Sequence, residues 1–123
     1  MVENEEFRVE INAENFPDEI FREFVKTNFD KDKDGFLSED EICGVTRIYL
    51  SEKEISDLEG IENFICLNCL NCDRTKIKKL DVSNNPHLWT LNCANTGIEE
   101  LDVSNNPLLW RLYCSNTTLQ LYK

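Results

Sequence analysis

Apolar residues in the C-terminal part of the chain recur with a fixed period of 21 residues. Residues 80–86 (LDVSNNP) return unchanged as residues 101–107, and residues 88–93 (LWTLNC) return as residues 109–114 (LWRLYC). Periods of about 20 to 50 residues are typical of solenoids, in which each coil buries its apolar face against the next. The pattern therefore predicts a stack of similar coils.

Two weaker copies precede this pair. The nearer copy keeps the apolar positions at Leu67, Leu70, Cys72, Ile77 and Leu80. The first copy keeps them at Val45, Ile48, Leu50, Ile55 and Leu58, with one extra residue before the next copy begins. We expect about four coils, which together span residues 45–123.

Apolar residues within each unit lie two or three positions apart and never form a helical stripe with a period of about 3.6 residues. Pairs separated by one residue, as in Leu91/Cys93 and Leu101/Val103, are typical of short strands whose alternate side chains point inward. Each coil is predicted to carry two short strands. The Ser-Asn-Asn-Pro stretch is a turn signal that closes each coil, because Asn side chains bond to nearby backbone and Pro fixes its own φ.

Residues 45–123 resemble the bacterial leucine-rich repeats with nested 21-residue units, which are common in surface and secreted proteins of gut anaerobes. The resemblance covers about two thirds of the chain, and proteins of this type begin with a similar helical segment. It implies an α+β fold, in which a leucine-rich-repeat solenoid of short parallel strands follows an N-terminal helical cap. It also implies a secreted or bacterial cell-surface binding module.

Residues 1–44 lack the repeat and are predicted to form this cap, packed with the solenoid as one unit. Apolar residues at helical spacing surround and follow Pro17, which suits a first helical turn: Phe16, Ile20, Phe21, Phe24 and Val25. A helix from about Pro17 to Phe29 is predicted. Its apolar face should cover the first coil, because an open solenoid end exposes core side chains and unpaired strand edges.

Residues 30–41 (DKDKDGFLSEDE) match the twelve-residue loop of an EF-hand. The ligands would be the carboxylates of Asp30, Asp32 and Asp34, the Phe36 carbonyl, Ser38 directly or through water, and both carboxylate oxygens of Glu41. Calcium is a hard ion that takes about six to eight oxygen ligands, which flexible carboxylates supply. The loop predicts one bound Ca²⁺ ion, and a solvated Asp-rich turn is the alternative.

We expect this calcium to be structural. Sensor EF-hands usually work in pairs and open a Met-rich groove, whereas this sequence has one such loop and its only methionine is Met1. Leu37, at the eighth loop position, should pair its extended segment with the solenoid instead of a second hand. A calcium-responsive regulatory module is the alternative.

Charge and composition exclude two classes of partner. The net charge of −11, from 24 acidic and 13 basic side chains, repels the phosphates of nucleic acid and of anionic membranes. No stretch approaches the roughly 20 consecutive apolar residues of a membrane-spanning helix. We therefore expect no nucleic-acid binding and no membrane insertion. The N-terminus shows no basic segment followed by an apolar run, so a secreted precursor would already have lost its signal.

Six cysteines are present, and three of them share one repeat position: Cys72, Cys93 and Cys114. That position takes a small inward-facing apolar residue, and buried free cysteine behaves as one. We expect a reduced cysteine ladder without disulfides, because parallel stacked side chains do not suit disulfide geometry. Cys66 and Cys69 with Cys72 begin a ferredoxin-like spacing, but no fourth cysteine follows at the required distance. Cys69, expected to be exposed, is either a reactive thiol or a chance surface residue.

No nucleophile with a base, convergent acid pair or open metal site is visible outside the calcium loop, so we expect no enzyme activity. Binding should use the outward strand positions and two indoles at the rim of the sheet, Trp89 and Trp110, which should stack on each other. The strand positions are Arg47, Tyr49 and Ser51 on the first coil, Thr90, Asn92 and Ala94 on the third, and Arg111, Tyr113 and Ser115 on the fourth.

Three alternatives stay open for the function. The partner is a protein, peptide or glycan, or the chain is a spacer of a larger surface protein without its own ligand. The two indoles either anchor a partner or only pack against each other. The last coil ends at residues 119–123 without a second Leu-Asp-Val-Ser strand, which leaves an end that is either capped by those residues or available for self-association.

Overall fold

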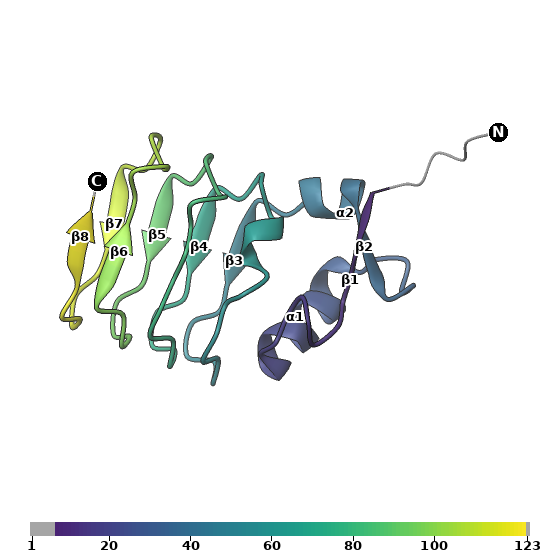
Figure 1. The fold of residues 1–123 in the computed structure, drawn as a ribbon, viewed down its shortest axis with the longest axis horizontal. Helices are drawn as coiled ribbons and strands as arrows, with labels where there is room; N and C mark the ends of the chain where they lie inside the picture. The colour runs from purple at the N-terminus through teal and green to yellow at the C-terminus, as the bar shows by residue number, and fades with distance from the viewer. Residues whose placement is uncertain (1–6, 123) are drawn as a thin grey trace.

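The computed structural model describes residues 7–122 and shows a row of stacked coils with a helical cap at the N-terminal end (Figure 1). The predicted limits of the cap and of the array, at residues 1–6 and Lys123, lie outside the described residues. The elements in chain order are β1 (Arg8–Glu10), α1 (Glu19–Phe29), β2 (Phe36–Ser38), α2 (Glu39–Cys43), β3 (Arg47–Tyr49), the 3-10 turn η1 (Ile61–Asn63), β4 (Cys69–Asn71), β5 (Thr90–Asn92), β6 (Glu100–Asp102), β7 (Arg111–Tyr113) and β8 (Gln120–Tyr122).

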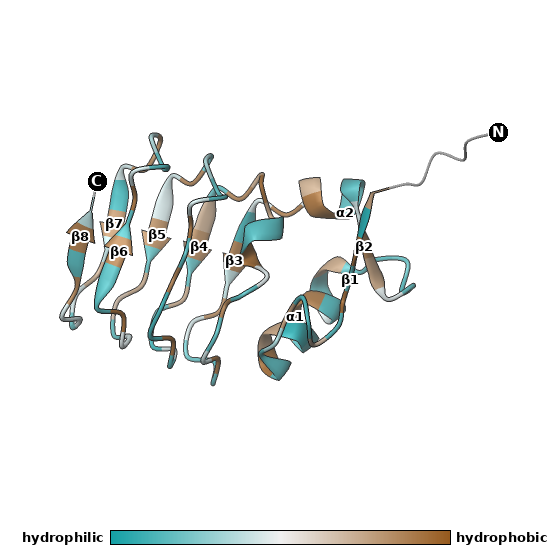
Figure 2. Cartoon of the chain, in the orientation of Figure 1, coloured by the Kyte–Doolittle hydropathy of each residue, from teal (hydrophilic) through white to brown (hydrophobic). Residues whose placement is uncertain are grey.

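One parallel sheet runs along the solenoid in the order β3-β4-β5-β7. Its register places Ile48, Leu70, Leu91 and Leu112 side by side. These are the positions that the repeat aligned, including the extra residue between the first two coils, so the predicted solenoid of about four coils is confirmed. Strands β3, β4 and β5 bury their central residue and β7 half-buries it, and the hydropathy alternates along the strands accordingly (Figure 2).

The prediction of two strands in every coil is wrong for the earlier coils. Only β6 and β8 form a second ladder within residues 7–122, with Leu101 opposite Leu121. On the same side, the earlier coils are joined by isolated bonds: Lys76 N–H donates to the Ile55 carbonyl at 2.9 Å and Gly97 N–H to the Ile77 carbonyl at 3.0 Å. A single bond between coils satisfies the backbone there without a strand ladder.

The end of the last coil is occupied by a second strand. Residues Gln120–Tyr122 form the second strand of the last coil, although they lack the Leu-Asp-Val-Ser sequence. Leu121 takes the place that Leu101 has in the preceding coil, and Val103 N–H donates to the Tyr122 carbonyl at 2.7 Å. The alternation of polar and apolar residues, rather than the motif itself, decides strand formation here.

Helix α1 begins two residues later than predicted. Asp18 is its N-cap, and the Asp18 carboxylate accepts hydrogen bonds from the Ile20 and Phe21 N–H groups, both at 3.0 Å. Pro17 therefore precedes the cap instead of occupying the first turn. An Asp N-cap satisfies two otherwise unpaired N–H groups, which fixes the start of the helix.

Buried residues of the cap and of the solenoid belong to a single core. The Phe29 and Phe64 rings meet with centroids 5.4 Å apart, and Phe16 lies 6.4 Å from Phe64. The second carboxylate oxygen of Asp18 accepts a 2.8 Å hydrogen bond from the N–H of Ser56 in the first coil. The helical cap thus covers the apolar end of the first coil.

The second asparagine of each Ser-Asn-Asn-Pro stretch joins neighbouring coils. Asn85 is fully buried, and its Nδ2 donates to the Ile61 and Phe64 carbonyls, both at 3.0 Å. Asn106 Nδ2 donates in the same way to the Val82 and Asn85 carbonyls, at 2.9 and 3.0 Å. The motif therefore contributes bonds between coils in addition to the predicted turn.

Replacing Asn85 by Ala should lower the free energy of unfolding by about 2 to 3 kcal/mol, because two buried carbonyls lose their donor. The neighbouring Asn84 is exposed and serves as the matched control. Asn84→Ala should change stability by no more than about 0.5 kcal/mol. Urea unfolding followed by circular dichroism measures both variants. Equal losses of stability in the two variants would contradict the role of Asn85 in joining neighbouring coils.

Candidate functional sites

The acidic loop lies between α1 and α2 and brings four carboxylates together. One oxygen from each of Asp30, Asp32, Asp34 and Glu41 lies within 4.8 Å of the others. Asp30 is buried and Glu41 half-buried, whereas Asp32 and Asp34 are exposed. Gly35 has a φ of 84°, which a residue with a side chain rarely adopts, and this allows the sharp turn of the loop.

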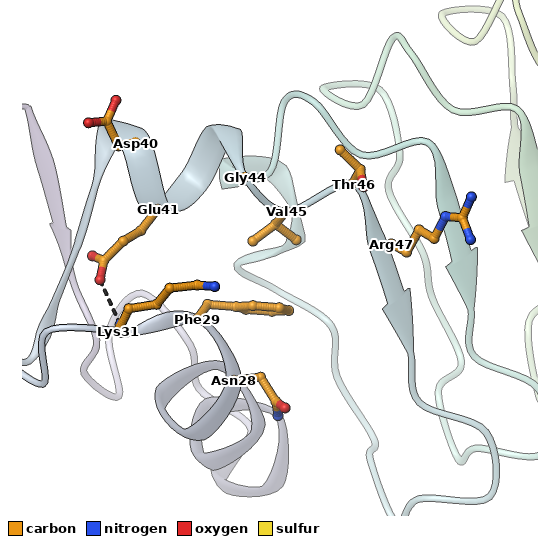
Figure 3. Close-up of a pocket in the computed structure, with 9 residues that line it drawn as sticks. All are labelled: Asn28, Phe29, Lys31, Asp40, Glu41, Gly44, Val45, Thr46 and Arg47. Atoms are coloured by element: carbon orange, nitrogen blue, oxygen red, sulfur yellow. Dashed lines mark hydrogen bonds between the residues drawn. The ribbon is translucent and has the colours of Figure 1, made fainter.

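Backbone N–H groups hold these carboxylates in place. Asp30 Oδ2 accepts from Gly35 N–H at 2.9 Å, and Asp34 Oδ1 accepts from Phe36 N–H at 2.9 Å. Glu41 Oε2 accepts from Lys31 N–H at 2.7 Å, which draws the end of the loop back to its beginning (Figure 3). The oxygens therefore converge from both ends of the loop.

Ser38 and Glu41 also form a capping box at the start of α2. The Ser38 hydroxyl accepts from Glu41 N–H at 3.1 Å, and Glu41 Oε1 accepts from Ser38 N–H at 2.9 Å. A capping box fixes the first turn of a helix. The predicted ligands of the loop are thereby tied to the helix that follows it.

Desolvation, hydrogen bonds and neighbouring charges shift the pKa values of two loop carboxyls. Desolvation raises the pKa of Asp32, and its hydrogen bond to Asp34 and the charges of Asp34 and Glu41 add to the rise. The Phe36 N–H lowers the pKa of Asp34 by donating to its charged form. The pKa values of these two neighbouring carboxyls therefore shift in opposite directions. The donor set is all oxygen, which fits a hard divalent cation such as Ca²⁺.

The strand partner predicted for Leu37 is wrong. Strand β2 pairs antiparallel with β1, and Leu37 lies opposite Val9 rather than against the solenoid. Leu37 itself is fully buried in the common core. The alternation of residues 8–11 (RVEI) was the available signal for β1, because such alternation is typical of a half-buried strand.

A shallow hollow separates the loop from the first coil, and sequence reasoning missed it. Figure 3 shows the side chains that line it. They come from the end of α1, the loop, α2 and the start of β3: Asn28, Phe29, Lys31, Asp40, Glu41, Gly44, Val45, Thr46 and Arg47. Arg47 thus belongs both to this hollow and to the sheet.

The outward side chains of β3, β4, β5 and β7 form one surface, which we call the strand face. Arg47 and Tyr49 lie at one edge and Arg111 and Tyr113 at the other, all exposed. The half-buried residues between them are smaller: Cys69, Asn71, Thr90 and Asn92. The structure thus brings the five predicted strand residues, Arg47, Tyr49, Asn92, Arg111 and Tyr113, onto one face.

Two expectations for the surroundings of this face are wrong. Ala94 is buried instead of outward-facing, because it follows the strand where the chain turns inward. Trp89 and Trp110 are 53% and 67% exposed, and ring pairs among residues 7–122 involve only phenylalanines. The guanidinium of Arg111 lies over the Trp110 ring instead, 4.4 Å from its centre, and this cation–π contact takes the place of the second indole.

The ladder cysteines lie inside the coils as expected from the repeat. Cys72 and Cys93 are buried, Cys114 is half-buried, and the Cys72 thiol donates to the Asn92 carbonyl at 3.4 Å. Burial raises the pKa of the Cys93 thiol from 9.0 to about 11 and raises that of Cys72 as well. Cys69 is half-buried rather than exposed, because it lies in β4 between two neighbouring strands.

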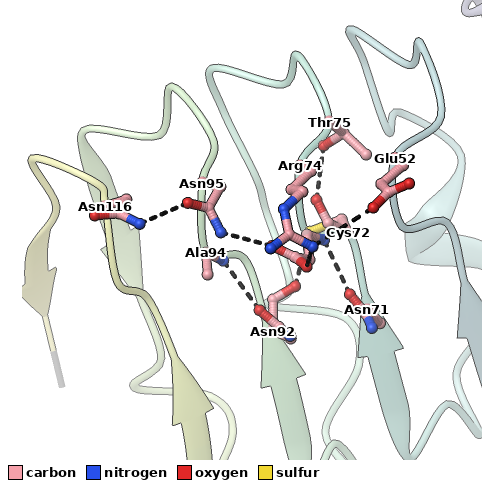
Figure 4. Close-up of polar contacts among 10 residues, drawn as sticks. Glu52, Asn71, Cys72, Arg74, Thr75, Asn92, Ala94, Asn95 and Asn116 are labelled. Atoms are coloured by element: carbon pink, nitrogen blue, oxygen red, sulfur yellow. Dashed lines mark hydrogen bonds and ion pairs between the residues drawn. The ribbon is translucent and has the colours of Figure 1, made fainter.

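A row of polar contacts follows the strands on one side of the coils (Figure 4), and sequence reasoning missed it. Asn116 Nδ2 donates to Asn95 Oδ1 at 2.7 Å, and Asn95 Nδ2 donates to Asp73 Oδ1 at 2.9 Å. Arg74 forms an ion pair with Glu52 at 3.5 Å. Arg74, Asn95 and Asn116 have φ near 55°, a conformation that asparagine tolerates well, so the Asn at two repeats was the available signal.

Two solved structures share this architecture over nearly the whole chain. The functional domain of InlJ from Listeria monocytogenes superposes with a TM-score of 0.82 and 28% identity over 94% of this chain. The chain is a leucine-rich-repeat solenoid. An internalin from the same organism, inlF, superposes on this solenoid with a TM-score of 0.80 and 20% identity over 93% of the chain.

The alignment with this chain covers 25% of the InlJ chain and 34% of the inlF chain, so this chain spans only part of the length of either protein. InlJ is described as including a cysteine ladder, and Cys72, Cys93 and Cys114 form such a column here. No protein-family model and no curated protein matches the sequence. None of the helices within residues 7–122 has the length and apolar character needed for a membrane crossing.

The buried thiols predict a loss of stability at alkaline pH. A thiol whose folded pKa is raised contributes stability below the unfolded value of 9.0, and this contribution disappears as the pH rises through about 11. The melting temperature should therefore fall between pH 8 and 11. The double variant Cys72→Ala, Cys93→Ala should show a smaller fall over that range in thermal scans, whereas equal slopes would contradict the role of these thiols.

Proposed function

We propose that this solenoid is a non-enzymatic binding module of a bacterial surface or secreted protein, and that it holds a protein partner on its strand face. The observation that carries the proposal is the arrangement of exposed Arg–Tyr pairs at both edges of one four-stranded face. Tyr and Arg are the residues that contribute most often to protein interfaces, since they combine large contact area with polar groups.

The shape and charge of the strand face support this function. Three strand spacings of about 4.8 Å separate β3 from β7, so the two Arg–Tyr pairs lie about 14 Å apart. The smaller residues of β4 and β5 lie between the two pairs. None of the eight outward residues is acidic, although the chain carries a net charge of −11. The face therefore avoids the repulsion that the rest of the molecule would impose on an acidic partner.

The assignment to a bacterial surface or secreted protein draws on the family resemblance and on the Listeria origin of the two structural neighbours. A peptide or a glycan is the alternative ligand, because Tyr, Asn and Arg side chains also suit sugar hydroxyls. A spacer of a larger surface protein is the alternative from another class. The spacer requires no particular chemistry on the strand face, whereas the binding module requires its Arg–Tyr pairs.

We further propose that the acidic loop holds one structural Ca²⁺ ion. Asp30, Asp32, Asp34 and Glu41 supply converging carboxylates, and the Phe36 carbonyl and Ser38 complete the expected set. When bound, the ion would neutralise the repulsion among these acids. Leu37 and Ile42 connect the loop to the core, so the ion supports the cap that covers the first coil.

Replacing Tyr49 and Tyr113 by Ala should reduce the affinity for a binding partner at least about tenfold, because each removes an exposed aromatic anchor. Candidate partners come from arrays of extracellular proteins, peptides and glycans, with affinities measured by interferometry. Ile65→Ala and Leu108→Ala are the matched control. These residues are 51% and 50% exposed, close to 52% for Tyr49 and 48% for Tyr113, but lie in the turns before the strands.

The control variant should bind normally, and both double variants should melt within a few degrees of the parent. Loss of binding in both double variants would mean that the effect is not specific to the tyrosines of the strand face. Unchanged binding in the tyrosine variant would reject the strand face, and a chain that binds nothing on the arrays would favour the spacer.

Calcium should raise the free energy of unfolding by about 2.7 kcal/mol at a hundredfold excess over its Kd, provided the unfolded chain does not bind. Glu41→Gln should abolish most of this gain, because it removes a charged ligand of the loop. Glu39→Gln changes the same charge on an exposed residue outside the carboxylate cluster and should retain the gain. Thermal scans with calcium and with chelator test this, and calcium-independent melting of the parent would reject the site.

The same scans separate a structural from a regulatory ion. A structural ion changes the melting temperature but leaves partner affinity unchanged at temperatures where both forms are folded. A change in partner affinity on adding calcium to the folded chain would support the regulatory alternative.

A further inference from the structure

Strand β1 lies against the acidic loop, although none of its residues is an expected calcium ligand. It pairs antiparallel with β2, and Val9 lies opposite Leu37. The pairing continues one step beyond the two strands, because Ile11 N–H donates to the Gly35 carbonyl at 3.0 Å. A segment outside the loop therefore holds the second half of the loop, from Gly35 to Ser38.

The register of this pairing decides which backbone groups of the loop face β1. In an antiparallel ladder, residue pairs that exchange hydrogen bonds alternate with pairs that do not. Ile11 and Gly35 are a bonded pair, so Val9 and Leu37 are the next bonded pair along the ladder. Phe36 lies between Gly35 and Leu37 and belongs to a pair that does not exchange bonds. Its N–H and carbonyl therefore point away from β1.

The groups that point away from β1 face the carboxylates of the loop. Phe36 N–H donates to Asp34 Oδ1 at 2.9 Å, and Ser38 N–H donates to Glu41 Oε1 at 2.9 Å. The Phe36 carbonyl lies on the same side of the strand as the Phe36 N–H and is therefore directed toward the same acids. The pairing with β1 thus directs the one expected backbone ligand toward the other ligands.

Strand β1 is anchored in the cap by contacts that do not involve the acidic loop. Val9 and Ile11 pack against the common core. The Glu10 carbonyl accepts a 2.8 Å hydrogen bond from Asn15 Nδ2, in the segment that leads to α1. The loop therefore pairs with a strand that the rest of the cap holds in place.

We propose that β1 positions the calcium ligands of the acidic loop, so that residues 8–11 help to set the affinity for Ca²⁺ without touching the ion. This role rests on the structural Ca²⁺ site proposed above. Ligands that are oriented before binding lose less conformational freedom when the ion arrives, and they bind more tightly for that reason. Linkage requires the reverse effect as well, so the bound ion stabilises the pairing of β1 with β2.

The test measures the Ca²⁺ affinity of the intact chain and its variants by titration calorimetry. Val9→Pro removes the N–H that faces Leu37 in the bonded pair. It should weaken calcium binding at least about tenfold, because the ion must then hold the loop strand without this bond. Val9→Ala shortens the same side chain but keeps the N–H, and it should bind with an affinity close to that of the parent.

Glu10→Pro is the matched control for the proline. The Glu10 N–H points away from β2, and an edge strand tolerates proline at such a position. Its affinity should stay within about threefold of the parent, although this variant also loses an acidic charge. In chelator, the two proline variants should melt within a few degrees of each other, so that they differ only in their response to calcium.

Two results of the titrations would overturn the proposal in different ways. Equal Ca²⁺ affinities of Val9→Pro and Glu10→Pro would reject the role of β1 and leave the calcium site in place. A parent chain with neither a heat of calcium binding nor a calcium-dependent melting temperature would reject the site and the role of β1 together.

Amide hydrogen exchange of the parent chain tests the same coupling without a substitution. The Leu37 N–H, which faces β1, should exchange at least about tenfold more slowly with bound calcium than in chelator. The Gly97 N–H, which donates to the Ile77 carbonyl far from the cap, is the control and should slow less. Equal changes at the two amides while calcium is bound would overturn the proposal, even if Val9→Pro fails to fold.

Discussion

Each coil of this solenoid buries its apolar residues only against the coils beside it, so the first coil depends on the cap for its second neighbour. Phe64 faces the cap there, and the rings of Phe16 and Phe29 cover it. Gly60 shows how tight this contact is. An added Cβ at Gly60 would lie 2.2 Å from Cδ1 of Phe16, and its φ of 110° is one that side chains disfavour. The cap and the first coil are therefore closely packed at this contact.

The same stacking sets the polar structure of the molecule. A residue that recurs every 21 positions meets its own copies one strand spacing away, so a single side-chain choice repeats as a column. Thr75, Thr96 and Thr117 each donate to the carbonyl of the ladder cysteine three residues earlier, at 2.6 to 2.8 Å. Asn85 and Asn106 bond to the backbone of the preceding coil. Such columns satisfy the backbone groups that a chain turning inside a compact fold would otherwise leave unpaired.

The proposed functions lie at different distances from this shared core. The strand face consists of side chains that point away from the core. The acidic loop is bound to the core through Leu37 and Ile42.

The sequence alone determined the repeat, the strand register, the buried ladder cysteines and the set of acidic residues in the loop. These features depend on spacing along the chain, and a fixed period places equivalent residues side by side in every coil. Only the tertiary structure decided which segments pair beyond that period: β1 with β2, and β6 with β8. It also decided that Arg111, rather than Trp89, contacts the Trp110 ring. The strand pairs join segments that the repeat does not align, and the Arg111–Trp110 contact depends on side-chain direction. Residue spacing leaves several partners possible for each, and the final packing selects one of them.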